Sequence, residues 1–156
     1  YAAWQESDGA ARRVRVAVRG GSGTWSFVDG QGLFREQGKD ALSPRLAEHA
    51  GRLYAAWHED NGSSRQVRVA VYNGADASPS WRLVDGGGPA GLGGDPSRHA
   101  LFPSLASAGG VLYAAWYELT EGPRRARVAA DNGDDAVPAW SFADGGGPRR
   151  RYLIRP

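Results

Sequence analysis

Three tryptophan–glutamate pairs, each followed by an arginine, are the clearest candidates for chemistry in this sequence. The sets are Trp4, Glu6 and Arg15; Trp57, Glu59 and Arg68; and Trp116, Glu118 and Arg127. Because residues two apart on a strand share a face, each indole ring would lie beside a carboxylate, with guanidinium donors nearby. A sugar can stack on such a ring and donate its hydroxyl hydrogen bonds to the acid. The pattern predicts one carbohydrate-binding site per copy; the alternative is core tryptophans and structural Glu–Arg pairs.

Histidines provide a second, catalytic hypothesis. His58 stands where the related segments carry Gln5 and Tyr117, and it precedes Glu59. A histidine beside a carboxylate can act as a general base or bind a metal ion. His58 and Glu59 are therefore the catalytic candidates, and His58 with Asp85 the candidates for a divalent metal. His49 and His99 also break the pattern, and the alternative for all three is an ordinary surface histidine.

The remaining sequence features provide few further candidates for chemistry and exclude several kinds of site. Asp29, Asp85 and Asp144 each precede a glycine, which is foremost a turn signal. The sequence has no cysteine, which rules out disulfides and thiolate ligands. It also has no phosphate-binding loop, dinucleotide fingerprint, HExxH motif or nucleophile elbow. No cofactor is predicted from the sequence, beyond the divalent metal that the second hypothesis would use.

The candidate residues belong to an internal repeat with four elements in fixed order. The first is Tyr1–Glu6, Tyr54–Glu59 and Tyr113–Glu118; the second Val14–Val18, Val67–Val71 and Ala126–Ala130; the third Trp25–Gly30, Trp81–Gly86 and Trp140–Gly145; the fourth, present twice, Ala41–Ala47 and Ala100–Ala106. Self-similarity of this kind indicates a repeat architecture. The repeats span about 1–40, 41–99 and 100–147, and a basic tail follows at 148–156.

Each element has the character of a short β-strand. Val67, Val69 and Val71 alternate with Arg68 and other side chains, the period of two expected for a strand with unlike faces. Asn-Gly pairs and glycine runs between the elements predict tight turns. Four antiparallel strands per repeat is the content of one β-propeller blade, so the sequence predicts an all-β propeller with three four-stranded blades.

Three blades are too few to close a ring, because propellers typically have about 4–8. We therefore expect homodimerisation to complete a six-bladed ring, since two-fold symmetry is the commonest in oligomers. The first copy starts at its second strand, which would leave an unpaired edge at the junction. The tail segment Tyr152–Arg155 is a candidate strand across that junction, and a frayed tail is the alternative.

The pattern Leu112-Tyr-Ala-Ala-Trp-x-Glu118, followed by Arg-Val-Ala and Trp-x-Phe/Leu-x-Asp-Gly, resembles the tandem repeats of bacterial β-propeller proteins. These are similar to kelch-like and tectonin-like lectin propellers, and the resemblance covers nearly the whole chain. It implies a ring with ligand sites on one face, in the central channel or between blades. It does not imply a reaction.

Charge and composition narrow the partners. The net charge is only +2 despite 19 basic residues, and Arg149–Arg151 lie in the basic tail, which fits a solvated segment better than a nucleic-acid site. No apolar run approaches the roughly 20 residues of a membrane span. We expect self-association and a carbohydrate or other small molecule, without nucleic acid or membrane. A secreted or cell-surface parent protein is consistent with this, but no compartment is assigned.

Three functions compete at this point. The leading hypothesis is a multivalent, non-catalytic, lectin-like binding module, because candidate groups that repeat favour binding over a single catalytic centre. The second is a metal-assisted ester or phosphoester hydrolase with its site in the channel of a dimeric ring, which rests on analogy between folds. The third is a truncated propeller scaffold without an activity of its own.

Overall fold

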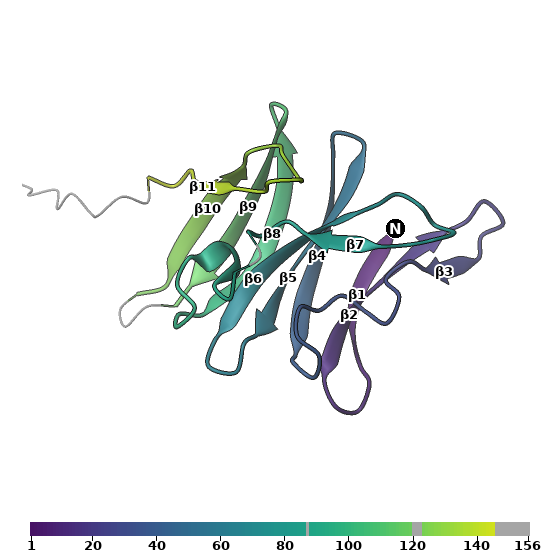
Figure 1. Ribbon diagram of the computed structural model, residues 1–156, viewed down its shortest axis with the longest axis horizontal. Helices are drawn as coiled ribbons and strands as arrows, with labels where there is room; N and C mark the ends of the chain where they lie inside the picture. Colours follow the sequence, from purple (N-terminus) through teal and green to yellow (C-terminus); the bar gives the residue numbers. More distant parts are fainter. Residues whose placement is uncertain (87, 120–122, 146–156) are drawn as a thin grey trace, which may run out of the picture.

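The chain folds into three antiparallel sheets, as a computed structural model shows for residues 1–86, 88–119 and 123–145 (Figure 1). The first sheet contains β1 (Ala2–Ser7), β2 (Arg12–Arg19) and β3 (Trp25–Phe27). The middle sheet contains β4 (Ala41–His49), β5 (Arg52–Asp60), β6 (Arg65–Tyr72) and β7 (Trp81–Leu83). The third sheet contains β8 (Ala100–Ala108), β9 (Val111–Glu118), β10 (Arg125–Asp131) and β11 (Trp140–Phe142). A single 3₁₀ turn, Gly91–Gly93, is the helical element of these described ranges.

The three sheets repeat one another in register as well as in strand order. Trp4 pairs with Arg15 across β1 and β2, Trp57 with Arg68 across β5 and β6, and Trp116 with Arg127 across β9 and β10. Side chains of directly paired residues lie on the same face of the sheet. The tryptophan, glutamate and arginine of each set therefore share one face, as the sequence predicts.

The sheets stack face to face, with the middle sheet between the other two (Figure 1). One core cluster joins the first and middle sheets and includes Val16 and Trp57, and the other joins the middle and third sheets and includes Val69 and Trp116. Every residue of β6 after Arg65 is consequently buried, whereas burial in β2 and β10 is broken by exposed and half-buried positions. The alternation in β6 thus separates two buried faces, rather than a buried face from a solvated one.

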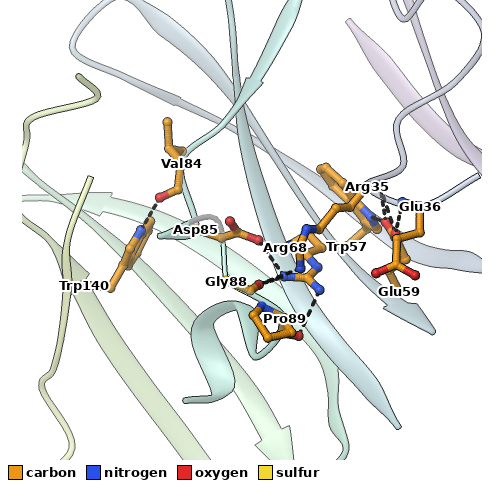
Figure 2. Close-up of polar contacts among 10 residues, drawn as sticks. All are labelled: Arg35, Glu36, Trp57, Glu59, Arg68, Val84, Asp85, Gly88, Pro89 and Trp140. Carbon is orange, nitrogen blue, oxygen red and sulfur yellow. Dashed lines mark hydrogen bonds and ion pairs between the residues drawn. The ribbon is translucent and has the colours of Figure 1, made fainter. Parts of the chain in front are cut away.

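Both junctions between sheets use the same hydrogen bonds. Trp81 donates its indole N–H to the carbonyl oxygen of Val28 in the preceding sheet at 2.7 Å. Trp140 donates in the same way to Val84, also at 2.7 Å (Figure 2). A tyrosine–aspartate contact also recurs, since the hydroxyl of Tyr1 donates to Asp76 at 3.3 Å and that of Tyr54 donates to Asp135 at 3.0 Å. The repeat is therefore a repeat of interfaces as well as of sheets.

A β-bulge marks the first strand of both four-stranded sheets. The register shifts between Leu42 and Arg45 in β4, and again at the equivalent place in β8. Ser43 and Phe102 occupy the bulges with φ of 55° and 54°, values that side-chain-bearing residues rarely adopt. Each is followed by a proline, which lacks the N–H of a ladder bond and suits a bulge in an edge strand.

The all-β prediction is confirmed at the level of separate antiparallel sheets, and the described strands do not close into a barrel or ring. The first sheet has three strands because it has no counterpart of β4 and β8 within the described residues, as expected from the repeat. The predicted junction strand at Tyr152–Arg155 lies outside those residues. Across the described ranges, no helix has the length and apolar character needed to cross a membrane.

Candidate functional site

In the middle sheet, the residues of the predicted binding set are buried and make structural hydrogen bonds. Trp57 and Glu59 are 0% and 1% exposed, and the indole N–H donates to Glu59 at 2.9 Å (Figure 2). The Glu59 carboxylate also accepts the backbone N–H groups of Arg35 and Glu36 at 2.8 Å each. These groups belong to the segment that connects the first and middle sheets. Glu59 therefore anchors a connection, and its oxygens do not face solvent.

The repeated arginines pair with the repeated aspartates in all three sheets. Arg15 contacts Asp29 at 2.7 Å, Arg68 contacts Asp85 at 3.2 Å and Arg127 contacts Asp144 at 2.7 Å. The expected Glu–Arg pairing is thus replaced by Asp–Arg pairing, although Glu118 also approaches Arg127 at 3.7 Å. Asp29 additionally accepts the backbone N–H of Val16 at 2.8 Å, which ties the turn after β3 to the centre of β2.

In the first sheet, the same positions lie on a face that none of the other described sheets covers. Trp4 is 36% exposed and Phe27 52% exposed, and their rings lie 5.8 Å apart. The Arg15 guanidinium lies 4.1 Å from the centre of the Phe27 ring, a cation–π distance. Trp4 donates to the exposed Glu6 at 3.2 Å. The structure therefore brings this set together as an accessible cluster of two aromatic rings, a carboxylate and a guanidinium.

In the third sheet, the set is covered by the middle sheet. Trp116, Glu118 and Arg127 are 3%, 5% and 6% exposed. Phe142 remains 45% exposed, with the Arg127 guanidinium 3.9 Å from its ring centre. The three copies of one motif thus occupy different environments, because two face a neighbouring sheet and one does not.

The histidines form hydrogen bonds between neighbouring sheets. The His58 Nδ1 accepts the backbone N–H of Phe102, the bulge residue of the third sheet, at 3.2 Å. Gln5 occupies the same repeat position and accepts the N–H of Ser43, the other bulge residue, at 3.0 Å. Burial, with a smaller effect from Arg65 and Arg12, lowers the pKa of His58 to about 4. His58 is therefore neutral at pH 7, with Nδ1 committed to a structural bond.

The remaining histidines have comparable partners. His99 Nδ1 accepts the backbone N–H of Arg65 at 3.1 Å, and His49 Nδ1 shares a hydrogen bond with Ser107 at 2.8 Å. Within the described parts of the chain, no three His, Asp or Glu side chains gather where they could hold a metal ion. His58 and Asp85 have separate partners, since Asp85 pairs with Arg68 on β6 and His58 accepts from Phe102 on β8.

A hollow between the first and middle sheets was not anticipated from the motifs. It has a volume of about 210 Å³. Its walls include Trp81, Ser80 and Pro79 from the middle sheet, and Asp29 and Leu33 from the first. Trp81 is held in place by its bond to Val28 and by stacking on Tyr72, with ring centres 5.0 Å apart. The hollow thus has a fixed aromatic wall beside turn backbone.

The same hollow occurs again between the middle and third sheets. Its volume is about 220 Å³, and Trp140, Asp85 and Leu92 stand at the repeat positions of Trp81, Asp29 and Leu33. Gly91 lines it with φ of 51°, and a Cβ there would lie 2.2 Å from the Val67 carbonyl oxygen, so glycine is required. The third-element tryptophans and their Asp-Gly turns carried the sequence signal for these hollows.

The two hollows share the chemistry of a small, partly polar binding site. Each combines an indole with glycine residues in its lining, and each is below the roughly 300–1,000 Å³ typical of drug-sized ligands. The aspartate in each wall is paired with an arginine, which leaves aromatic and backbone groups as the available contacts. No protein-family model matches this chain, and neither does any curated protein or solved structure.

Proposed function

We propose that this chain is a non-catalytic, multivalent binding module of the propeller type, and that it binds carbohydrate in the hollows between adjacent sheets. The observation that carries the proposal is the duplication of the hollow at both junctions, with Trp81 and Trp140 at the same position. A sugar ring would stack against the indole while its hydroxyls reach backbone groups of the turns. Several weak, equivalent sites gain strength together on a surface that displays many sugars.

The hollows, rather than the Trp–Glu–Arg sets, are the sugar sites of this proposal. Trp57, Glu59 and Arg68 are buried, and so are Trp116, Glu118 and Arg127, so a sugar has no access to them in the chain as folded. Trp4, Glu6 and Arg15 are accessible, but they lie on a face whose counterparts are buried elsewhere in the molecule. The binding proposal therefore rests on the third-element tryptophans.

The hydrolase hypothesis has less support from the surroundings of its residues. A histidine general base needs an unprotonated nitrogen that is free to accept a proton, and a pKa near the working pH. His58 Nδ1 accepts a backbone N–H, and its pKa is lowered to about 4. The carboxylate of Glu59 accepts three hydrogen-bond donors inside the core. We therefore retain binding as the proposed function.

The proposed architecture of the functional unit is a six-bladed ring made from two chains. Support comes from the way one sheet-to-sheet interface is repeated at the next, which is how blades succeed one another around a propeller. Three sheets per chain reach the range of about 4–8 blades only as two copies, because three copies would give nine sheets.

Carbohydrate binding can be tested by a glycan array, followed by saturation-transfer NMR with millimolar monosaccharides. The change Trp140→Leu removes the aromatic wall of one hollow and leaves the other intact, so we expect about half of the transfer signal to remain. Val137→Ser is a matched control, because Val137 is 70% exposed and lines neither hollow. Absence of binding to any sugar at millimolar concentration would contradict the proposal.

A further inference from the structure

We infer that the open face of the first sheet binds the open face of the third sheet of a second copy, head to tail. The head face is defined by Trp4, Trp25 and Phe27, which point away from the middle sheet. The tail face is defined by Tyr117, Val128 and Ala143, on the opposite end of the stack. The inference rests on the two-chain ring proposed above and assigns the surfaces and contacts that would close it.

Each open face is the counterpart of a face that the chain buries internally. Val67 and Val69 are 0% exposed inside the second junction, whereas Ala126 is exposed and Val128 half-buried at the same positions of the third sheet. Trp57 is 0% exposed inside the first junction, whereas its counterpart Trp4 is 36% exposed. The two open faces therefore present the two halves of an interface that already forms twice within one chain.

One hydrogen bond of this interface has its donor and acceptor at opposite ends of the chain. Trp81 donates to Val28 and Trp140 donates to Val84, each at 2.7 Å. The third member of the donor series is Trp25, which is 54% exposed and whose indole N–H has no partner among the described residues. The third member of the acceptor series is Ala143, which is exposed although Val28 and Val84 are 0% and 1% exposed. The geometry predicts a bond from Trp25 to the Ala143 carbonyl oxygen of the second copy.

The shape of the occupant is thus specified by the chain itself. A foreign partner would have to fit the open face of the first sheet and also place a hydrogen-bond acceptor at the Trp25 N–H. The third sheet of a second copy offers both, with the Ala143 carbonyl oxygen as the acceptor. The exposed aromatic side chains of the head face, with Trp25, Phe27 and Trp4 at 54%, 52% and 36%, form the kind of patch that marks an interaction surface. A second copy is therefore the occupant to which we commit.

The junction between copies would be weaker than the junctions within a chain. The hairpin between β2 and β3, Gly20–Thr24, is shorter than its counterparts and supplies no equivalent of Asp76 and Asp135, which bind tyrosine hydroxyls at the internal junctions. The first sheet also has no counterpart of β4 within the described residues. Dilution should consequently separate the copies while each chain stays folded.

Complementary blocking variants test the head-to-tail arrangement. Trp25→Glu blocks the head and Ala143→Glu blocks the tail, and both residues are exposed in the single chain, so the fold should survive. By sedimentation velocity, the unaltered chain should have twice its 16.6 kDa mass, and each variant alone should be a monomer. A mixture of the two variants should form a 1:1 pair through the one junction that joins the intact head to the intact tail, more weakly than the unaltered dimer because the other junction contains both glutamates.

The outcomes separate the inference from the ring proposal. A monomeric unaltered chain at tens of micromolar overturns both. A dimer that persists in Ala143→Glu alone, or in Trp25→Glu alone, means that copies pair through like faces and overturns only the head-to-tail inference. Failure of the mixture to associate even at hundreds of micromolar also overturns it. Val137→Glu, which places the same charge away from both faces, should keep the dimeric mass.

A milder variant protects the test against loss of folding. Trp25→Phe keeps an aromatic ring, although a smaller one, and removes the N–H, so the dissociation constant of the dimer should rise roughly tenfold or more, since two junctions each lose one hydrogen bond. Circular dichroism should be unchanged. An unaltered dissociation constant would overturn the assigned bond between Trp25 and Ala143.

Discussion

Glu6 and Glu59 occupy the same position of the repeat, yet only one of them holds the fold together. Glu59 is 1% exposed and accepts the backbone N–H groups of Arg35 and Glu36 together with the Trp57 indole N–H. Glu6 is exposed and accepts from Trp4 at 3.2 Å. A carboxylate that replaces water for several buried donors contributes much more than one on the surface.

The change Glu59→Gln should therefore destabilise the chain, by about 2–3 kcal/mol, because an amide turns one acceptor oxygen into a donor that faces other donors. The matched change Glu6→Gln should stay within about 0.5 kcal/mol of the unaltered chain. Urea unfolding at pH 7 measures both free energies. Equal effects at the two positions would show that the anchoring bonds of Glu59 contribute little.

His58 gives the chain a specific response to acid. Burial lowers its pKa to about 4, below the ordinary value of about 6.5, so the unfolded chain binds a proton between these pH values and the folded chain does not. The stability that depends on neutral His58 is thus complete above about pH 6.5 and is lost as the pH falls towards 4. The loss amounts to about 3 kcal/mol.

His58→Gln should remove this response. Gln5, at the same repeat position, accepts a bulge N–H as His58 does, so glutamine can replace the bond. We expect the unfolding free energy of the variant to fall less than that of the unaltered chain between pH 7 and pH 4.5. Burial raises the pKa of Asp131, which acts in the opposite direction in both proteins, so the comparison isolates His58. Identical pH profiles would contradict the assignment.

At the scale of strands and sheets, the local sequence pattern was sufficient to predict some features. Period-two alternation and turn residues predicted the second-element strands, and Val67–Val71 lies inside β6. The first sheet has three strands within the described residues, as the order of the repeated elements predicts. These features depend on chain-local information, because strand type and hairpin pairing are set by neighbours in sequence.

Burial, ion-pair partners and hollows depend on how segments pack against one another, so the local sequence pattern did not predict them. Trp4 and Trp57 have the same local sequence, but only Trp57 faces another sheet, so burial separates them. The arginine partner was expected to be glutamate, and the turn aspartates take that role because the turn after each third strand reaches the second strand. The hollows were not predicted for the same reason, since each is formed by turns and strands of two different sheets.

For the whole molecule, the pattern of burial indicates a stack of sheets with an exposed face at each end. The middle sheet is buried on both faces, and it supplies residues to both core clusters. Each outer sheet has one buried face and one open face, and large apolar side chains lie on the open ones. In a repeat protein, stability is approximately a sum over units and the interfaces between neighbours, so one more interface at each end adds directly to it.

Thermal unfolding should therefore depend on protein concentration. If two chains complete one another, association stabilises the folded state by mass action, and Tm should rise by about 1–3 °C for each tenfold increase in concentration. Ala143→Glu, which blocks the tail face without disturbing a buried residue, should have a lower Tm that does not change with concentration. Differential scanning calorimetry from micromolar to hundreds of micromolar provides the measurement. A Tm of the unaltered chain that is independent of concentration would place the open faces in contact with solvent rather than with a second copy.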